Sequence, residues 1–416
     1  MQMLLHTDRK LQVTAVEKAR RQKKPLIPAL SRTGKKRKSD YYDYNLVAII
    51  IFLTCFGLIM LYSTSSYIAE VENGDSMFYF KKQAMISVVC IIAALIISQI
   101  DYHILTRFVT ILYVAAMVLM MLVKTPLGIE ANGARRWLGV GETLQFQPSE
   151  IAKIAVIVCL PYMIVHMGKK VQTLKACMIL AAMGGGLAFV TYVFTENMST
   201  AIIIFCITAG LIFIAHPKVK PFLIIAGTAL VAIVMFVLFL NATVDPLNND
   251  NFRIRRILVW LHPEDFASGA GYQTIQGLYA IGSGGLLGRG LGNSIQKLGS
   301  VPEAQNDMIF SIVCEELGIL GGILVLLMFA YLLYRLFFIA QNAPDLYGSL
   351  MVTGIFAHIA LQVILNICVV INVIPTTGIT LPFVSYGGTS VLFLMVEMGI
   401  ALSVSRKIKF QDKIEG

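Results

Sequence analysis

The chain has 416 residues and a formal net charge of +10 at pH 7. Hydrophobic residues make up 57% of it and charged residues only 14%, and the mean hydropathy is +0.74. A water-soluble domain of this length carries more charged residues, because its surface must face water. The composition therefore excludes a soluble enzyme and predicts a polytopic membrane protein.

The seven cysteines are spread along the chain without any CxxC spacing, and most fall inside apolar runs. They are expected to be small buried hydrophobic residues rather than disulfides. The six histidines are equally scattered, and no HxxxH or HExxH pair places two of them on one helical face. A metal site built from protein ligands is therefore not expected.

The positive charge is concentrated near the amino terminus, where lysines and arginines run densely from Arg9 to Lys38. No apolar segment follows the first charges, which excludes a cleaved signal peptide. One interpretation is an arm that binds nucleic acid or a protein partner. The favoured one is a disordered cytoplasmic tail, residues 1–44, that lies against anionic lipid and fixes the topology, with no nucleic-acid partner.

Each membrane-spanning helix needs about twenty mostly apolar residues. On this rule the sequence predicts an all-α protein with ten transmembrane helices, at about 45–62, 84–100, 104–123, 150–166, 175–194, 199–215, 220–240, 308–334, 347–372 and 383–404. The membrane domain is expected over residues 45–405, between the tail and a second cytoplasmic tail at 406–416. Residues 241–307 form the largest loop, between spans seven and eight.

Basic residues set the predicted orientation. With the amino-terminal tail inside, the short loops that alternate with the large one carry most of the remaining charge: His103, Arg107, Lys169, Lys170, Lys175, Lys218, Lys220 and Arg335. The positive-inside rule places such loops in the cytoplasm. Both termini are therefore predicted to be cytoplasmic, in the plasma membrane, and loops 63–83, 124–149, 241–307 and 373–382 are predicted to face outward.

Two outward segments offer cations to an anionic ligand. Before span four, Arg135 and Arg136 stand beside Trp137, which suits a phosphate-bearing lipid headgroup or, equally, an interfacial anchor. Glu150 and Lys153 follow three residues apart on one helix face and are expected to pair, because a lone charge at that depth is costly.

In the large loop, Arg253 and Arg255 would present two cations on one side if the segment is extended, with Arg256 next to them. The glycines between Gly282 and Gly290 would let backbone amides approach an anion. The bland alternative is that they simply form turns. No strand precedes them and no Lys-Ser/Thr follows, so a nucleotide-binding loop is not predicted.

A carboxylate stands where this polar loop meets the next apolar run, at Asp307. Local chemistry favours Asp307 or Asn306 as the cap of the following helix, and the alternative is an acid or base acting at the membrane surface. Further along the same span, Glu315 and Glu316 lie on different faces, and at least one must face the protein interior. Each is expected to be a buried carboxylate bonded to a neighbouring helix, with catalysis the less favoured alternative, and Glu397 in the last span has the same two interpretations.

Five motifs occur in order over roughly residues 45–405: NGARRW (132–137), QPSE (147–150), GSGGLLGRGLG (282–292), PEAQNDMIFSIVCEELG (302–318) and IPTTGITLPFVSYGG (374–388). Together they resemble the shape, elongation, division and sporulation (SEDS) family of membrane proteins. The form PEAQND, rather than the PERHTD typical of the rod-shape members, makes the chain more similar to the division and sporulation members.

The resemblance implies an inverting peptidoglycan glycosyltransferase that polymerises lipid II, an undecaprenyl-diphosphate disaccharide-pentapeptide, at the outer face of the cytoplasmic membrane during cell division. Asp307 falls on the family's essential aspartate, which would deprotonate the 4-hydroxyl of the acceptor sugar. The candidate residues for binding the diphosphate and the rest of lipid II are Arg135, Arg136, Glu150, Lys153, Arg253, Arg256 and Ser385. Expected partners are a class B penicillin-binding protein transpeptidase and other division proteins. No cofactor is expected for certain, and Mg²⁺ or Mn²⁺ beside the diphosphate is left open.

The sequence departs from the family pattern at two places. Glu196 and Asn197 replace a Pro-Asp pair, so a catalytic role at that position is not expected, and Thr377 stands where many division members carry lysine. Two other functions compete with polymerisation. A lipid II flippase would use Glu150, Lys153, Glu315 and Glu397 as a polar path through the membrane, and a non-catalytic scaffold would only recruit division partners.

Overall fold

The computed structural model describes residues 39–131, 134–140, 144–244, 252–269, 271–298 and 301–410. Most of the predicted basic tail and residues 411–416 lie outside this part of the chain. Residues 40–409 form one compact unit, and the description below concerns that unit.

Within the described residues, ten helices are long and apolar enough to cross a membrane. They are α2 (Tyr44–Asn73), α3 (Phe78–Ile97), α4 (Leu105–Leu122), α5 (Pro148–Met167), α6 (Leu174–Phe194), α7 (Met198–Ala215), α8 (Lys220–Thr243), α11 (Ile309–Asn342), α12 (Leu346–Val370) and α13 (Gly388–Arg406). Short 3₁₀ turns extend α4 and α5, namely η1 (Tyr102–Ile104) and η2 (Gly168–Gln172). The predicted ten-span, all-α membrane architecture is confirmed.

Several predicted boundaries are wrong. Residues 78–83, expected in a loop, belong to α3, and Arg335, expected in a cytoplasmic loop, lies inside α11. Residues 63–73, expected in a loop, continue α2, because the hydroxyls of Thr64 and Ser65 bond back to the carbonyl of Leu61 and so remain compatible with a helix. The helix ends where Gly74 adopts φ 67°. The last span begins at Gly388 rather than at 383, although Phe383 is buried in the turn before it. The apolar residues from 383 onward thus belong first to a buried turn and then to the helix α13.

A small antiparallel sheet between α4 and α5 was not predicted. Its strands are β2 (Gly128–Ala131), β3 (Ala134–Val140) and β4 (Leu144–Phe146), in the order β2-β3-β4. Leu138 is the centre of the register, since it pairs with Gly128 on one side and with Phe146 on the other. The register shifts between Ile129, which pairs with Trp137, and Glu130, which pairs with Arg135, so Arg136 is the extra residue of a β-bulge in β3.

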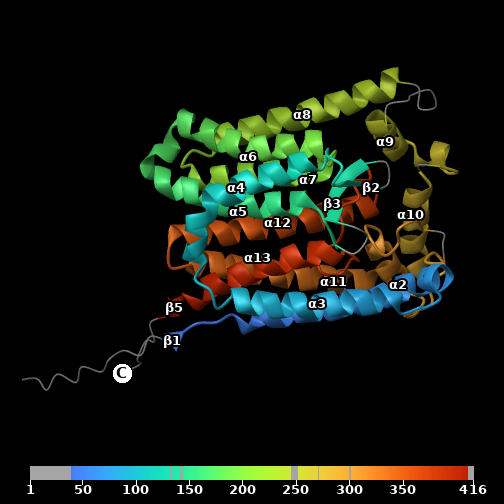
Figure 1. Cartoon of the computed structure of the whole chain (residues 1–416). Helices are drawn as coiled ribbons and strands as arrows, with labels where there is room; N and C mark the ends of the chain where they lie inside the picture. Colours follow the sequence, from blue (N-terminus) through green and yellow to red (C-terminus); the bar gives the residue numbers. More distant parts are fainter. Residues whose placement is uncertain are drawn as a thin grey trace, which may run out of the picture. The chain divides into compact units, whose positions relative to one another are not determined.

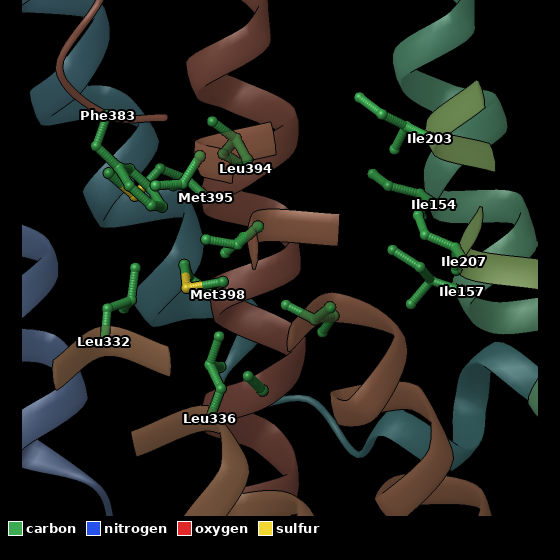
Figure 2. Close-up of a cluster of buried hydrophobic side chains, with 14 of the residues drawn as sticks. Ile154, Ile157, Ile203, Ile207, Leu332, Leu336, Phe383, Leu394, Met395 and Met398 are labelled. Carbon is green, nitrogen blue, oxygen red and sulfur yellow. The ribbon is translucent and has the colours of Figure 1, made fainter. Parts of the chain in front are cut away.

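The core lies between α5, α7, α11 and α13. Figure 2 shows Ile154 and Ile157 of α5 beside Ile203 and Ile207 of α7, while side chains of α11 and α13 form a second group. The residues of that second group labelled in the figure are Leu332, Leu336, Leu394, Met395 and Met398. By contrast, α8 buries only Leu240 and exposes nearly all its other side chains, as expected for a helix surrounded by lipid.

The large loop is mostly helical. It contains α9 (Phe252–Leu261), the turn η3 (Pro263–Phe266) and α10 (Tyr272–Gly284), while the two-residue strands β1 (Ser39–Asp40) and β5 (Lys409–Phe410) stand near the ends of the described chain. Figure 1 shows β2, β3, α9 and α10 at the same end of the long helices. We call this end of the bundle, with residues 301–308, the Asp307 end.

Candidate functional site

Asp307 lies directly before α11 but does not cap it. The N-cap residue is Met308, and no side chain makes a capping hydrogen bond there. The capping interpretation of Asp307 and Asn306 is therefore wrong, and the amide of Asn306 instead bonds to Glu303. The Asp307 side chain, only 8% exposed, needs another explanation.

Two helices hold Asp307. From α10, Gln273 Nε2 donates to its Oδ1 at 3.2 Å and to the Pro302 carbonyl at 3.3 Å. From α12, Asn366 Nδ2 donates to the Asp307 carbonyl and to the Ile379 carbonyl, both at 2.8 Å. The side-chain amide of Asn366 thus donates to two backbone carbonyls, and one of these is the carbonyl of Asp307 itself. The carboxylate is buried and oriented, with a side-chain hydrogen bond from Gln273.

Burial raises the pKa of Asp307 to about 6. The nearby carboxylate of Glu303 also raises this pKa, whereas the hydrogen bond from Gln273 and the positive charge of Arg256 lower it. A carboxylate with a pKa near neutrality can accept and release a proton under physiological conditions, which is the property required of a general base.

Arg256 and Arg136 bring positive charge to the same place from different elements. Arg256, half-buried on α9, has its pKa lowered by burial and by the neighbouring charge of Arg136, while Asp307 raises it. Arg136, on β3, donates from Nη2 to the Glu196 carbonyl at 3.4 Å, and its buried Nε finds no acceptor among the described residues. Burial also lowers the pKa of Arg136. A guanidinium group that interacts with the carboxylate, with a second guanidinium group near the first, forms a site suited to an anionic ligand that has a proton to give.

The other two candidate arginines are placed differently. Arg135 is largely exposed and pairs with Glu130 at 3.5 Å. The expectation that Arg253 and Arg255 share one side is wrong, because this segment is helical rather than extended. The side chain of Arg253 lies outside the described part of the structure.

Glu150 and Lys153 form the predicted ion pair, at 2.9 Å, with both side chains buried in α5. Within the described chain no hydrogen bond or ion pair joins this pair to Asp307. Ser385 is also buried, and its hydroxyl accepts from the Leu381 amide at 2.8 Å. Ser385 thereby closes a turn whose next residue, Tyr386, donates its amide to the Gln305 carbonyl at 2.9 Å. That turn thus supports the loop that carries Asp307.

The acidic residues inside spans behave as expected for buried, bonded carboxylates. Glu316 accepts hydrogen bonds from Ser63 of α2, and Glu397 bonds to His358 of α12 at 2.8 Å. The departure at Asn197 also has a structural reason, since its side chain caps α7 by accepting from the Thr200 amide at 3.0 Å.

Sequence reasoning missed Gln273 and Asn366. A signal was present for Asn366, because an amide inside an apolar span is costly unless it binds something. No comparable signal marked Gln273, which lies in a polar loop among many similar residues. Nothing in its sequence spacing indicated that α10 would reach Asp307.

The described residues contain no cluster of three histidine, cysteine, aspartate or glutamate side chains able to hold a metal ion. The charges that act on Asp307 come from Glu303 and Arg256. The site therefore combines a buried base with cations supplied by arginine.

Comparisons with known proteins agree with this architecture. The family model for FtsW, RodA and SpoVE, described as "Cell cycle protein", matches residues 44–410. Stage V sporulation protein E of Bacillus subtilis (strain 168) is 38% identical over 369 residues, which cover 88% of this chain and 98% of the relative. A protein named "Probable peptidoglycan glycosyltransferase FtsW", from Geobacter sp. (strain M18), is 32% identical over 376 residues, which cover 90% of this chain and 99% of the relative.

One solved structure is described as "Structural coordination of polymerization and crosslinking by a peptidoglycan synthase complex". One of its chains aligns with a TM-score of 0.72 at 24% identity, over 88% of this chain and 98% of that one. At this identity the likeness shows the fold. The family match and the two relatives cover nearly all of the ten-helix domain, in agreement with the motifs that resemble the SEDS family. The chain therefore belongs to the FtsW, RodA and SpoVE family of cell cycle proteins.

Proposed function

We propose that this chain is a peptidoglycan glycosyltransferase that polymerises lipid II, with Asp307 as its general base. The observation that carries the proposal is the buried carboxylate of Asp307, whose pKa is raised to about 6 and which interacts with the charge of Arg256, itself close to Arg136. Relatives named as peptidoglycan glycosyltransferases support the same chemistry.

In the proposed reaction, Asp307 takes the proton of the acceptor sugar's 4-hydroxyl. The hydroxyl oxygen forms a bond to the anomeric carbon of the donor, and the bond from that carbon to the diphosphate oxygen breaks with inversion. The undecaprenyl diphosphate leaves with the bonding electrons, so negative charge grows on the side of the leaving group. Arg256 and Arg136 neutralise this charge, which lowers the barrier more than it strengthens substrate binding.

The remaining candidates are assigned by their surroundings. Arg253, three residues before Arg256 on α9, is also proposed to bind the diphosphate. Arg135 is exposed and paired with Glu130, and it is proposed to contact lipid headgroups. The buried pair of Glu150 and Lys153 is proposed to contact lipid II farther from the reacting carbon, and Ser385 is proposed to act by shaping its turn.

A divalent cation beside the diphosphate finds little support in the donor set. No described cluster of three acidic, histidine or cysteine side chains could hold it, and arginine supplies the positive charge near Asp307. We assign no step of the reaction to Mg²⁺ or Mn²⁺.

The Asp307 end is proposed to face the outer side of the cytoplasmic membrane, with both termini inside, because the basic loops lie at the other ends of the spans. The proposed partner is a class B penicillin-binding protein transpeptidase, together with other division proteins. The proposal of a transpeptidase partner is supported by the similar solved structure, which is described as a peptidoglycan synthase complex that coordinates polymerisation and crosslinking. The proposed role is septal synthesis in division, supported by the FtsW relatives.

Reconstitution in liposomes separates this function from its rivals. The purified protein with its cognate transpeptidase should convert labelled lipid II into glycan strands that run as a ladder on a gel. A flippase would move labelled lipid II between leaflets without joining it, and a scaffold would do neither. Absence of glycan under conditions in which lipid II crosses the bilayer would refute the proposal.

A further inference from the structure

The glycine-rich segment after α10 closes a break in α11. Gly318 has φ 71° and ψ −175°, which interrupts the helix between residues 317 and 319. Four backbone hydrogen bonds replace those lost at the break. The donors and acceptors are Arg289 N to Glu315 O at 3.0 Å, Gly290 N to Glu316 O at 2.9 Å, Ile319 N to Gly285 O at 2.9 Å and Leu320 N to Leu286 O at 3.3 Å.

Side chains would not fit at this junction. A Cβ on Gly288 would lie 2.2 Å from the Glu316 carbonyl oxygen, and one on Gly318 would lie 2.3 Å from the Leu286 carbonyl oxygen. The glycines therefore serve close backbone contact between two segments of the chain. The residues after the break, 319–342, number 24, about 36 Å of helix, so they can cross a membrane without residues 309–317.

A buried charged cluster fastens the same junction to α2. Glu316 accepts from Ser63 Oγ at 2.7 and 2.8 Å and from Lys297 Nζ at 2.8 Å, and Lys297 Nζ also donates to Ser63 Oγ at 2.9 Å. Next to it, Glu315 accepts from the Ile295 amide at 3.1 Å and from the Ser294 hydroxyl. Both glutamates are fully buried, and Lys297 is 6% exposed. Burying such charges costs more desolvation energy than a packed apolar core of the same size, so the cluster is poorly explained by stability alone.

This junction is mechanically linked to Asp307 by two helices. Residues 309–317 run without a break from Met308, the neighbour of Asp307, to Glu316. Alongside them lies α10, where a Cβ on Gly277 would be 3.2 Å from Met308 Cε and one on Gly284 would be 2.0 Å from the Cys314 carbonyl oxygen. The first turn of α10 carries Gln273, which bonds to Asp307 Oδ1. Asp307 thus directly precedes one of two adjacent helices and its hydrogen-bond donor lies on the other. The far ends of both helices meet at the junction, where Glu316 belongs to the cluster and Gly285, directly after α10, bonds to Ile319.

We propose that Lys297, Glu316 and Ser63 are positioning residues for Asp307: they hold α10 and residues 309–317 in one register, and so keep the carboxylate bonded to Gln273 and aimed at the substrate. The inference rests on the proposed role of Asp307 as base. It assigns no contact with substrate to the cluster itself. A displacement of about 1 Å at a base can cost about 10²-fold in rate, so small shifts of these helices matter.

The test compares the double variant Lys297→Met/Glu316→Gln with each single variant. Each single change leaves one buried group without its partner and should lower the thermal stability. The double variant keeps the net charge and removes both partners, so it should recover most of the stability. If the cluster positions Asp307, the double variant should still lose about tenfold or more in kcat, with KM within about twofold of wild type.

The pH profile supplies a readout that lost stability alone does not move. The charged groups that act on Asp307 are Glu303 and Arg256, with Arg136 acting through Arg256. The double variant leaves all three in place. The hydrogen bond from Gln273 lowers the pKa of Asp307. Loosening this bond should therefore raise that pKa and shift the acid limb of kcat/KM to higher pH. A folded double variant with wild-type kcat and an unshifted acid limb would overturn the proposal.

Two further variants keep the result decisive. If the double variant does not fold, Ser63→Ala removes one partner of Glu316 without creating an unpaired charge, and it should shift the acid limb in the same direction by less. A wild-type profile for Ser63→Ala would then overturn the proposal. The matched control is Lys81→Met/Asp75→Asn, which removes an exposed ion pair of 2.8 Å and should change nothing. Activity retained in Asp307→Asn would refute the proposed base, whereas an inactive Asp307→Asn beside a normal double variant refutes only the positioning role.

Discussion

The acid limb of the pH profile reports on Asp307, and Gln273 tunes it without carrying a charge. Gln273→Leu removes the hydrogen bond to Asp307 Oδ1, at 3.2 Å. A hydrogen bond to an ionised group is worth about 1.5–3 kcal/mol, and a bond of this length belongs near the lower end. Since one pKa unit corresponds to about 1.4 kcal/mol, the pKa of Asp307 should rise by about one unit from its value of about 6.

A general base works only when ionised, so activity is lost as the pH falls through the pKa of Asp307. At pH 6 the ionised fraction should drop from about one half to about one tenth in Gln273→Leu, a loss of about fivefold in kcat/KM. At pH 8.5 both proteins are almost fully ionised and their rates should be nearly equal. The measurement is kcat/KM for lipid II polymerisation between pH 5 and pH 9.

The opposite shift provides the control. Glu303 raises the pKa of Asp307 by charge repulsion, so Glu303→Gln should move the acid limb downward. Protein that is merely destabilised loses active molecules at every pH and keeps the midpoint of the limb. Identical acid limbs in Gln273→Leu, Glu303→Gln and wild type would refute the reasoning that Asp307 is the titrating base.

Three further predictions concern charge. Arg136→Gln should lower kcat/KM by about 10²-fold because it removes a donor from the developing diphosphate charge, while the adjacent Arg135→Gln should change it by less than about threefold; steady-state kinetics decide. Lys153→Met should cost about 3–5 kcal/mol of stability by leaving Glu150 buried and unpaired, and Lys153→Met/Glu150→Gln should recover most of it in thermal unfolding. Asp307→Asn should raise the melting temperature at pH 7.5. The carboxylate has a pKa of about 6 in the folded protein and about 3.8 in the unfolded chain. Above pH 6 its ionisation therefore lowers the free energy of unfolding by about 3 kcal/mol. This cost decreases as the pH falls toward 3.8, and the stability advantage of Asp307→Asn should decrease with it.

The membrane architecture could be predicted because its signal is strong and one-dimensional. Twenty apolar residues in a row leave few alternatives to a spanning helix, and the ten spans follow from that rule. Their ends were less predictable. Residues 63–73 look polar enough for a loop, yet hydroxyls that bond back to the preceding turn let α2 continue to Asn73. Before the last span, the turn around Phe383 is so apolar that its sequence resembles the start of the helix, which begins only at Gly388.

The site could be predicted in part. Asp307 stood out by its place between a polar loop and an apolar run, and Arg136 and Arg256 by their charge. The sequence did not show that Arg136 would be partly buried near Arg256 while Arg135 stays exposed, because both depend on the pairing of β2 with β3. Long-range contacts also decide the role of Gln273, whose partner lies 34 positions away in the chain.

The glycine-rich motif shows a second limit of sequence reasoning. From composition it could be an anion-binding loop or a set of turns. In the structure it supplies backbone partners for the break at Gly318, with donors and acceptors on both segments. That pairing depends on α10 and α11 lying side by side, which no local pattern around Gly288 could indicate.

The central claim is that Asp307 is the base for glycan polymerisation, and one comparison tests it most directly. Purified wild type and Asp307→Asn, each with the cognate transpeptidase, are given labelled lipid II at pH 7.5, and the products are separated on a gel. Wild type should form a ladder of glycan strands, while Asp307→Asn should form none although it remains folded in thermal unfolding. A ladder from Asp307→Asn at the wild-type rate would contradict the account.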